Sequence, residues 1–280
     1  MAQDDYGRGA PLSYNRYLRV RELIALQECL STPPHHDELL FIITHQTYEL
    51  WFKQILHEID ASIAYMDEMR VVPATRALER VVEIEKLLLA QLHILETMTP
   101  FNFLEFRDRL KPASGFQSMQ FREIEFVSGL KDEGLLASFG DDELAVTRLR
   151  ARLGAPTLGE AFFALLKRRG FDAPEDDPTL PPEERRGRYE RRVRALVELL
   201  SHHERFAPEF HLAEKLIEHD EYFQLWRAHH VRMVERMVGT KRGTGGSEGV
   251  RYLRTTLDQK FIPELWEART HLELGHGEPD

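Results

Sequence analysis

Residues 35–59 read HHDELLFIITHQTYELWFKQILHEI, and this stretch is the strongest indication of the fold class. Apolar residues recur there at helical spacing and occupy most of the circumference: Leu39, Leu40, Ile42, Ile43, Leu50, Trp51, Phe52, Ile55, Leu56 and Ile59. A helix that is apolar on every side lies inside a larger helical protein. We therefore predict one long helix here, buried on nearly every side.

His45 is the polar residue inside this apolar run that most needs an explanation. It lies one turn after Phe41 and one turn before Glu49, on the same helix face. An unpaired buried polar group costs about 1–3 kcal/mol, so the imidazole needs a partner. The residue type leaves two interpretations open. His45 is either a core histidine bonded to Glu49 or to a backbone carbonyl, or a histidine that faces a ligand pocket.

The composition excludes several classes of protein. The 280 residues are 42% hydrophobic and 30% charged, with a formal net charge of −10. An acidic chain lacks the basic surface of a general nucleic-acid binder, and it does not suit an anionic membrane surface. The single cysteine, Cys29, excludes a disulfide framework and fits a reducing cytoplasm. We expect no signal peptide, and no apolar run reaches the ~20 residues of a membrane span.

The remaining periodicity predicts an all-α, single-domain helical bundle over residues 1–280. Apolar residues at helical spacing predict a second long helix that begins at Pro73 and packs antiparallel to the first. Residues 171–184, FDAPEDDPTLPPEE, are acidic and proline-rich. We predict an exposed loop there, an excursion within one domain, because amphipathic helical sequence resumes directly after it.

The N-terminal region is predicted to differ from the bundle. Residues 1–12 are polar and contain glycine and proline, so we expect a mobile segment. Residues 13–30 predict an arm with a short helix, capped by Ser13. Its Tyr14, Tyr17 and Leu18 share one face. This arm either covers the core of its own subunit or reaches a neighbouring chain.

Two polar motifs outside the long helices each allow two interpretations. In FNFLEFRDRL (residues 101–110), Arg107 clusters with Phe103 and Phe106. Its guanidinium either lies against an apolar wall or pairs on the surface with a neighbouring carboxylate. The glycine-rich KRGTGGSEG (residues 241–249) lacks the Lys-Ser/Thr of a phosphate loop. It is either a connector or a loop that closes over a substrate, to which Thr244 offers a small hydroxyl.

His230 adds a candidate cofactor ligand. It follows His229 in an apolar helical stretch that also contains Trp226 and Met237. A haem group needs an apolar slot and at least one imidazole. Two buried histidines on different long helices, His45 and His230, therefore favour a haem pocket inside the bundle.

Three blocks of sequence together resemble the tryptophan 2,3-dioxygenase family. They are FIITHQTYELWFKQILHEI (41–59), FLEFRDRL with SGFQSMQFREIEF (103–110 and 114–126), and LWRAHHVRMVERMVGTKRGTGGSEGV (225–250). The blocks occur in family order, and the resemblance runs from about Tyr14 to PELWEART (263–270). It implies an all-helical homotetramer with one b-type haem per subunit, active as Fe(II). It also implies insertion of O₂ across the indole C2–C3 bond of L-tryptophan, which gives N-formylkynurenine and begins tryptophan degradation by the kynurenine pathway.

The resemblance also implies roles for individual residues. By motif position, His230 corresponds to the proximal haem ligand and His45 to the distal histidine. Phe41 corresponds to the residue that packs on the indole, and Arg107 to the arginine that pairs with the substrate carboxylate. Thr244 corresponds to the loop residue that contacts the substrate ammonium and carboxylate.

Further residues follow from the same resemblance, with one departure. Ser114 and Gly115 match the loop that lines the distal face of the haem. At Phe103 some family members carry a tyrosine that helps to bind the carboxylate, and phenylalanine cannot donate that hydrogen bond. The planar guanidinium of Arg107 still suits a carboxylate alone. The arm residues expected to enter a neighbour's pocket are Tyr14, Tyr17 and Leu18.

Two competing interpretations stay open at the level of sequence. A haem-binding sensor or oxygen carrier of the same fold would keep both histidines and would need neither Arg107 nor Thr244. A helical scaffold without any cofactor would make all of these histidines structural.

Overall fold

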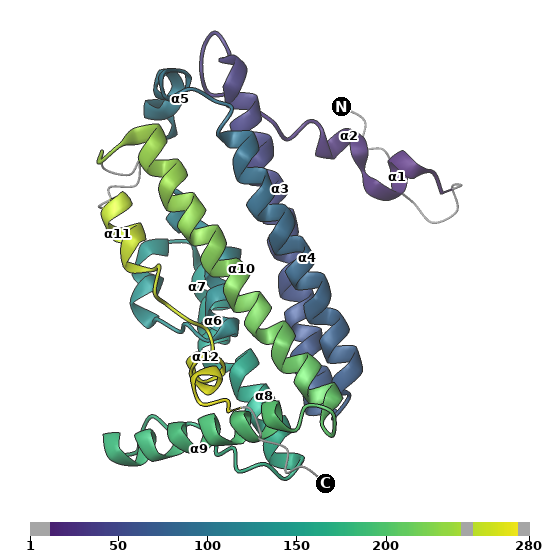
Figure 1. The fold of residues 1–280 in the computed structure, drawn as a ribbon. Helices are drawn as coiled ribbons and strands as arrows, with labels where there is room; N and C mark the ends of the chain where they lie inside the picture. Colours follow the sequence, from purple (N-terminus) through teal and green to yellow (C-terminus); the bar gives the residue numbers. More distant parts are fainter. Residues whose placement is uncertain (1–11, 242–248, 274–280) are drawn as a thin grey trace.

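Three long helices form the centre of the molecule. The computed structural model describes residues 12–241 and 249–273, and no strand occurs in these ranges. Helices α3 (His36–Asp67), α4 (Val71–Leu95) and α10 (Ala207–Val238) lie side by side (Figure 1). Residues 68–70 join α3 to an antiparallel α4, and α10 runs in the same direction as α4. The predicted all-α, single-domain bundle is confirmed.

Helix α3 is less buried than its sequence suggests. His35 caps its N-terminus, because its Nδ1 accepts a hydrogen bond from the Asp37 N–H at 3.1 Å. Phe52, Ile55 and Ile59 are buried in the core, but three other apolar residues of α3 are exposed. Those residues are Leu39 (44%), Ile43 (43%) and Leu50 (53%). The prediction of burial on nearly every side is therefore wrong for a single chain, because the neighbouring helices cover only part of the apolar circumference.

The start of α4 also differs from the prediction. The helix begins at Val71, so Pro73 is its third residue and not its first. The first four N–H groups of a helix have no partner within the helix. Proline, which lacks an N–H, therefore removes no helical hydrogen bond at this position.

Shorter helices close the two ends of the bundle. Near the C-terminal ends of α4 and α10 lie α5 (Pro100–Arg107), capped by Thr99, and α11 (Val250–Thr255). The opposite end carries α8 (Leu158–Arg168), α9 (Pro182–Ser201) and α12 (Pro263–Thr270). The other elements are η1 (Asp108–Leu110), η2 (Gly115–Gln117), α6 (Met119–Ser128), η3 (Glu133–Phe139) and α7 (Glu143–Gly154).

The acidic segment before α9 is anchored at its start. Most of residues 172–181 are exposed or half-buried, but Phe171 and Ala173 are buried in the main core. Phe171 packs against Phe206 with ring centroids 4.8 Å apart. These contacts hold the beginning of the segment on the bundle, and α9 follows from Pro182.

The N-terminal arm projects from the bundle. Helices α1 (Tyr14–Leu18) and α2 (Val20–Leu23) lie away from the three long helices in Figure 1. Ser13 caps α1 as predicted, and Tyr14 and Tyr17 are 75% and 72% exposed. The arm therefore does not cover the core of its own chain. The predicted mobile segment, residues 1–12, lies outside the described residues except for Leu12.

A buried carboxylate attaches the arm to α3. Glu38 accepts hydrogen bonds from the N–H of Leu30 at 2.7 Å, from the N–H of Ser31 at 3.1 Å, and from the Ser31 hydroxyl. Burial opposes ionisation of Glu38, but these donors and the charge of Arg109 outweigh it and lower its pKa. The ionised carboxylate thus holds the chain just before α3.

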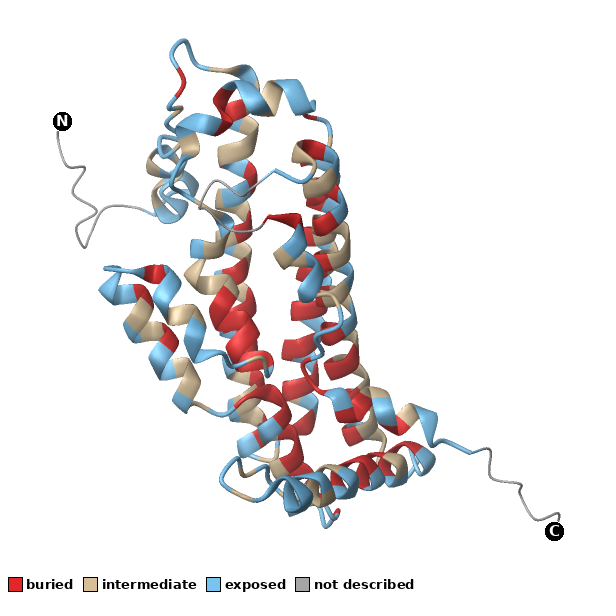
Figure 2. Cartoon of the chain, turned by 90° about the vertical axis from the view of Figure 1, so that its left-hand side faces the viewer, coloured by how far each residue is buried: buried red, intermediate tan, exposed pale blue. Residues whose placement is uncertain are grey.

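Burial follows the inner faces of the long helices. Figure 2 shows buried residues along the facing sides of the bundle and exposed residues on the short peripheral helices. Within the described ranges, none of the helices combines the length and apolar character required to cross a membrane.

Candidate active site

A mostly apolar cavity of about 620 Å³ lies between α3 and α10. Residues of α5, η2, α6 and α11 complete its wall. Cavities that bind small molecules usually enclose ~300–1,000 Å³ and place a few polar groups in an apolar lining. This cavity therefore has the size and the character of a ligand site.

His230 faces this cavity from α10. Trp226, one turn earlier, stacks on its ring at 4.8 Å with an interplanar angle of 8°. Within the described residues the His230 ring makes no hydrogen bond. Burial lowers the pKa of His230 to about 4, and the nearby His45 and His229 lower it further. The imidazole is therefore neutral, which is the form that binds a metal ion.

Trp226 is itself held in place. Its Nε1–H donates a hydrogen bond to the Tyr48 hydroxyl at 3.3 Å, and that hydroxyl donates to the Leu88 carbonyl at 2.5 Å. Burial raises the pKa of Tyr48 to about 12, so the phenol stays protonated and keeps both bonds. This relay fixes the ring plane that His230 stacks on.

His45 lines the cavity from α3. Its Nδ1 lies 2.7 Å from the Phe41 carbonyl oxygen, and the rings of Phe41 and His45 are 4.1 Å apart. If Nδ1 carries the proton and donates it to the carbonyl, Nε2 is an acceptor. Burial lowers the pKa of His45, against the weaker effects of the Phe41 carbonyl and Glu49. The side chain is not packed in the core, so the interpretation as a core histidine is wrong; His45 bonds a backbone carbonyl and is exposed toward the cavity that it lines.

Arg107 is buried at the last position of α5 and lines the same cavity. The surface interpretation of this arginine is therefore wrong. Phe103 stacks on Phe41 at 5.7 Å, and the fully buried Phe106 packs edge-on to both rings. Phe41 and Phe103 line the same cavity as Arg107, and Phe106 supports them from the core.

Ser114 and Gly115 reach the cavity through the short helix η2. The Ser114 hydroxyl accepts from the Phe116 N–H at 3.3 Å, and the Gln117 side chain accepts from the Ser114 N–H at 3.1 Å. This capping box fixes the loop. A Cβ added at Gly115 would meet no described protein atom within 4 Å, so the protein itself leaves that space open.

Sequence reasoning missed a buried ionic network in the cavity wall. Glu125 of α6 accepts from Arg122 at 2.6 Å and from Arg227 of α10 at 2.5 Å. All three side chains are buried, and all three line the cavity. Two guanidinium groups against one carboxylate leave excess positive charge, which suits a bound anion. The i, i+3 spacing of Arg122 and Glu125 was a readable signal, but nothing in the sequence paired them with Arg227.

The structure brings most of the predicted site residues to one cavity. These are Phe41, His45, Phe103, Arg107, Ser114, Gly115 and His230. Trp226 and Met237, expected as wall, also line it. Tyr14, Tyr17 and Leu18 lie on the projecting arm and do not line the cavity of their own chain. Thr244 lies outside the described residues.

Fold and site together define an all-α protein with a ligand cavity between two histidine-bearing helices. The sequence model described as tryptophan 2,3-dioxygenase matches residues 2–143 and 167–272. A tryptophan 2,3-dioxygenase of Nocardioides sp. is 48% identical over 95% of this chain and 96% of its own length. The enzymes of that name from Serratia proteamaculans (40%; 93% of each chain) and Myxococcus xanthus (41%; 93% of this chain and 89% of its own) are similar too. The chain belongs to the tryptophan 2,3-dioxygenase family.

Proposed function

We propose that this chain is a haem-dependent oxidoreductase that acts on L-tryptophan. It inserts both atoms of O₂ across the indole C2–C3 bond and gives N-formylkynurenine, the first step of tryptophan degradation by the kynurenine pathway. Family membership supports this function. The observation that carries it is a cavity shared by a buried Arg107 and a neutral His230 that bonds to none of the described residues.

The residues of the cavity fit a b-type haem, one per subunit. His230 offers a neutral ring that makes no hydrogen bond to any described residue, so one of its nitrogens would be available to hold the haem iron. Arg122 and Arg227 carry the positive charge that haem propionates need. The apolar lining supplies the slot. Ferrous haem, when bound, supplies the activation of O₂.

The chain's own residues then bind and orient the substrate. Phe41 and Phe103 offer aromatic surface to the indole, and Arg107 offers a planar guanidinium to the carboxylate. Nε2 of His45 accepts a hydrogen bond from the indole N–H, which holds the ring in one orientation. We assign no obligatory base role to His45, because an indole N–H is a very weak acid. Thr244 is proposed to contact the ammonium and carboxylate groups.

The competing sensor or oxygen carrier does not explain the buried arginine. Such a protein needs a haem ligand and a distal residue, and it has no need of a guanidinium in the wall of its pocket. Arg107 in one cavity with Phe41 and Phe103 favours an amino-acid substrate instead. A scaffold without cofactor leaves the cavity without a purpose, and likewise a His230 ring that bonds to none of the described residues.

One spectrum tests the proposal. The dithionite-reduced protein should show a Soret band, and addition of L-tryptophan in air should produce N-formylkynurenine absorbance. A Soret band without product would indicate a sensor or carrier. Absence of the band after haem is supplied would overturn the haem assignment.

Two variants test the assignment of the histidines. His230→Ala should purify largely without haem, because it removes the proposed iron ligand. His45→Ala should keep haem and lose activity, because only substrate orientation changes. Loss of haem in His45→Ala with retention in His230→Ala would show that the two roles are exchanged.

We further propose a cytoplasmic homotetramer in which the arm residues Tyr14, Tyr17 and Leu18 enter a neighbour's pocket. The exposed aromatic arm and the exposed Leu39, Ile43 and Leu50 of α3 support this assembly, because a second chain would bury them. Light scattering of the full chain should give the mass of four chains. A monomer at micromolar concentration would contradict it.

A further inference from the structure

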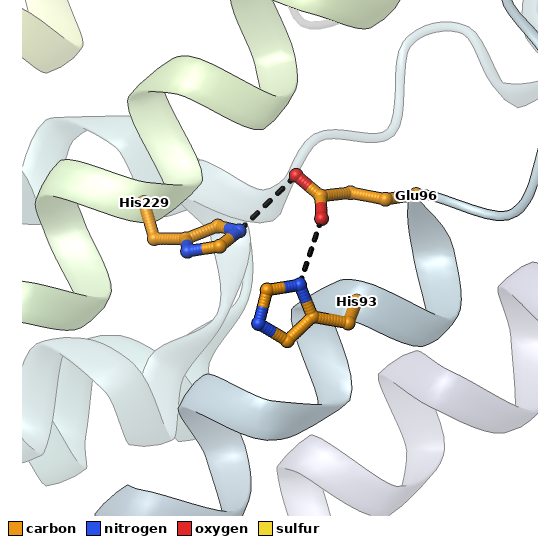
Figure 3. Close-up of side chains that lie close together, drawn as sticks. All are labelled: His93, Glu96 and His229. Carbon is orange, nitrogen blue, oxygen red and sulfur yellow. Dashed lines mark hydrogen bonds and ion pairs between the residues drawn. The ribbon is translucent and has the colours of Figure 1, made fainter.

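Two histidines and a glutamate meet on the outer side of the bundle. Figure 3 shows His93 and Glu96 at the end of α4 and His229 on α10, all directed toward one point. Nδ1 of His93 lies 2.9 Å from one carboxylate oxygen of Glu96, and Nε2 of His229 lies 3.1 Å from the other. The two imidazole rings are 4.7 Å apart, edge to face. One ligand atom from each residue lies within 4.8 Å of the other two.

We propose that His93, Glu96 and His229 form a binding site for a divalent transition-metal ion of the Zn²⁺ type. Zinc binds imidazole nitrogen at ~2.0–2.1 Å and carboxylate oxygen at ~2.0–2.2 Å, usually in a tetrahedron. In that geometry two ligand atoms lie roughly 3.3–3.5 Å apart. The observed separations of 2.9 and 3.1 Å are close to this, so small rotations of the exposed His93 and the half-buried Glu96 and His229 bring all three atoms to one ion.

The donor set selects the class of ion. Imidazole suits Zn²⁺, Co²⁺, Ni²⁺ and Cu²⁺, whereas Ca²⁺ and Mg²⁺ take mainly oxygen ligands. Two nitrogens and one carboxylate therefore exclude the alkaline-earth ions. The His93 side chain is 65% exposed, so solvent can supply the fourth ligand and the ion has an entry path.

The cluster is separate from the proposed active site. None of its three residues lines the cavity, although His229 directly precedes His230. A bound ion would link the last turn of α4 to the turn of α10 that carries the proposed haem ligand. This proposal does not depend on haem or on the dioxygenase activity, because binding of the ion is itself the readout.

The competing interpretation is a hydrogen-bonded cluster that pins α4 to α10 without any metal. Calorimetric titration of Zn²⁺ into the haem-loaded full chain, after treatment with a chelator, separates the two. We expect one ion per chain and a rise of a few degrees in the thermal midpoint with Zn²⁺ in excess. No saturable binding, or an unchanged midpoint, would overturn the site.

Three variants assign the binding to these residues. His93→Ala removes one of three ligands and should weaken binding at least as much as the roughly 10–100-fold that loss of an outer-shell partner costs. Glu96→Gln keeps the shape and removes the charge, and it should weaken binding similarly. His57→Ala, an exposed histidine on α3 outside the cluster, should bind like the wild type. Wild-type affinity in His93→Ala and Glu96→Gln, or equal loss in His57→Ala, would overturn the proposal.

Discussion

His219 and His230 lie on the same helix, eleven residues or about three turns apart, and their surroundings are opposite. Nδ1 of His219 lies 2.8 Å from Glu85, and the Ser128 hydroxyl lies 2.9 Å from its Nε2. His219 is almost fully buried and stacks on Phe261. His230 stacks on Trp226 and bonds to none of the described residues. The half of α10 that carries His219 is thus closely packed against neighbouring elements, and the half that carries His230 faces a cavity.

The contrast between the two histidines shows how a ligand pocket in a helical bundle can be recognised. Around His219 the protein supplies partners for both ring nitrogens, and no room is left for a ligand. Around His230 it fixes the ring plane through Trp226 and Tyr48 and leaves the nitrogens to a bound molecule. A histidine whose ring is held in place and whose nitrogen has no partner among the described residues is the better ligand candidate.

The largest expected loss of stability comes from a substitution of His219 in the closely packed half of α10. His219→Ala leaves both Glu85 and Ser128 buried without their imidazole partner, and each unsatisfied buried polar group costs about 1–3 kcal/mol. Denaturant unfolding at a fixed protein concentration measures the loss. His230→Ala, in the haem-free protein, should cost clearly less. His211→Ala, on an exposed position of α10, should change little. Equal losses in His219→Ala and His230→Ala would remove the distinction between the two halves.

A smaller effect is expected for Arg107 in the cavity wall, and it concerns KM and not the free energy of unfolding. Arg107→Ala should raise KM for tryptophan roughly 10–100-fold, because hydrogen bonds to a charged group contribute about 1.5–3 kcal/mol. Steady-state kinetics of the haem-loaded protein measures it. Arg150→Ala, an exposed arginine of α7, is the matched control and should leave KM unchanged. An unchanged KM in Arg107→Ala would remove this residue from the carboxylate role.

The helical periodicity and the resemblance predicted the bundle and most of the cavity wall. His45 and His230 stand in apolar stretches of sequence, which made them candidates, and the resemblance then implied their roles. Two features were not predictable. Glu125 pairs with Arg227 across 102 positions of sequence, and such pairing depends on tertiary packing. The exposed Leu39 and Leu50 look like core residues, because periodicity does not tell whether the covering surface belongs to the same chain.

Tyr48 of α3 tests how the cavity wall is held, because its hydroxyl joins Leu88 to Trp226. Tyr48→Phe removes the bonds to Leu88 and Trp226 and should cost about 1 kcal/mol near neutral pH. Because burial raises the pKa of Tyr48 to about 12, its phenol is protonated in the folded chain where an unfolded tyrosine ionises. The stability that this group contributes is therefore present below pH ~10 and lost as the pH rises from ~10 to ~12.

Unfolding curves across that window measure the effect in wild type and variant. Tyr48→Phe should show a shallower fall of stability, by up to roughly 2–3 kcal/mol, than the wild type. Tyr189→Phe is a second test of the same linkage, because that tyrosine donates to Glu267 on the outer side, away from the cavity, and its pKa is also raised. It should flatten the profile too, whereas a fall in Tyr48→Phe as steep as in the wild type would show that the Tyr48 phenol contributes none of the loss.

Gly115→Ala should give the smallest effect and the most specific one. An added Cβ meets no described protein atom within 4 Å, so stability should stay within about 0.5 kcal/mol of the wild type. If the open space serves a bound molecule, the methyl group should weaken haem retention or raise KM for tryptophan by up to about tenfold. Gly154→Ala meets equally open space at the end of α7, outside the cavity, and should change neither quantity. Normal haem retention and normal KM in Gly115→Ala would mean that the protein leaves this space open for solvent, and the η2 loop would lose its proposed role in the site.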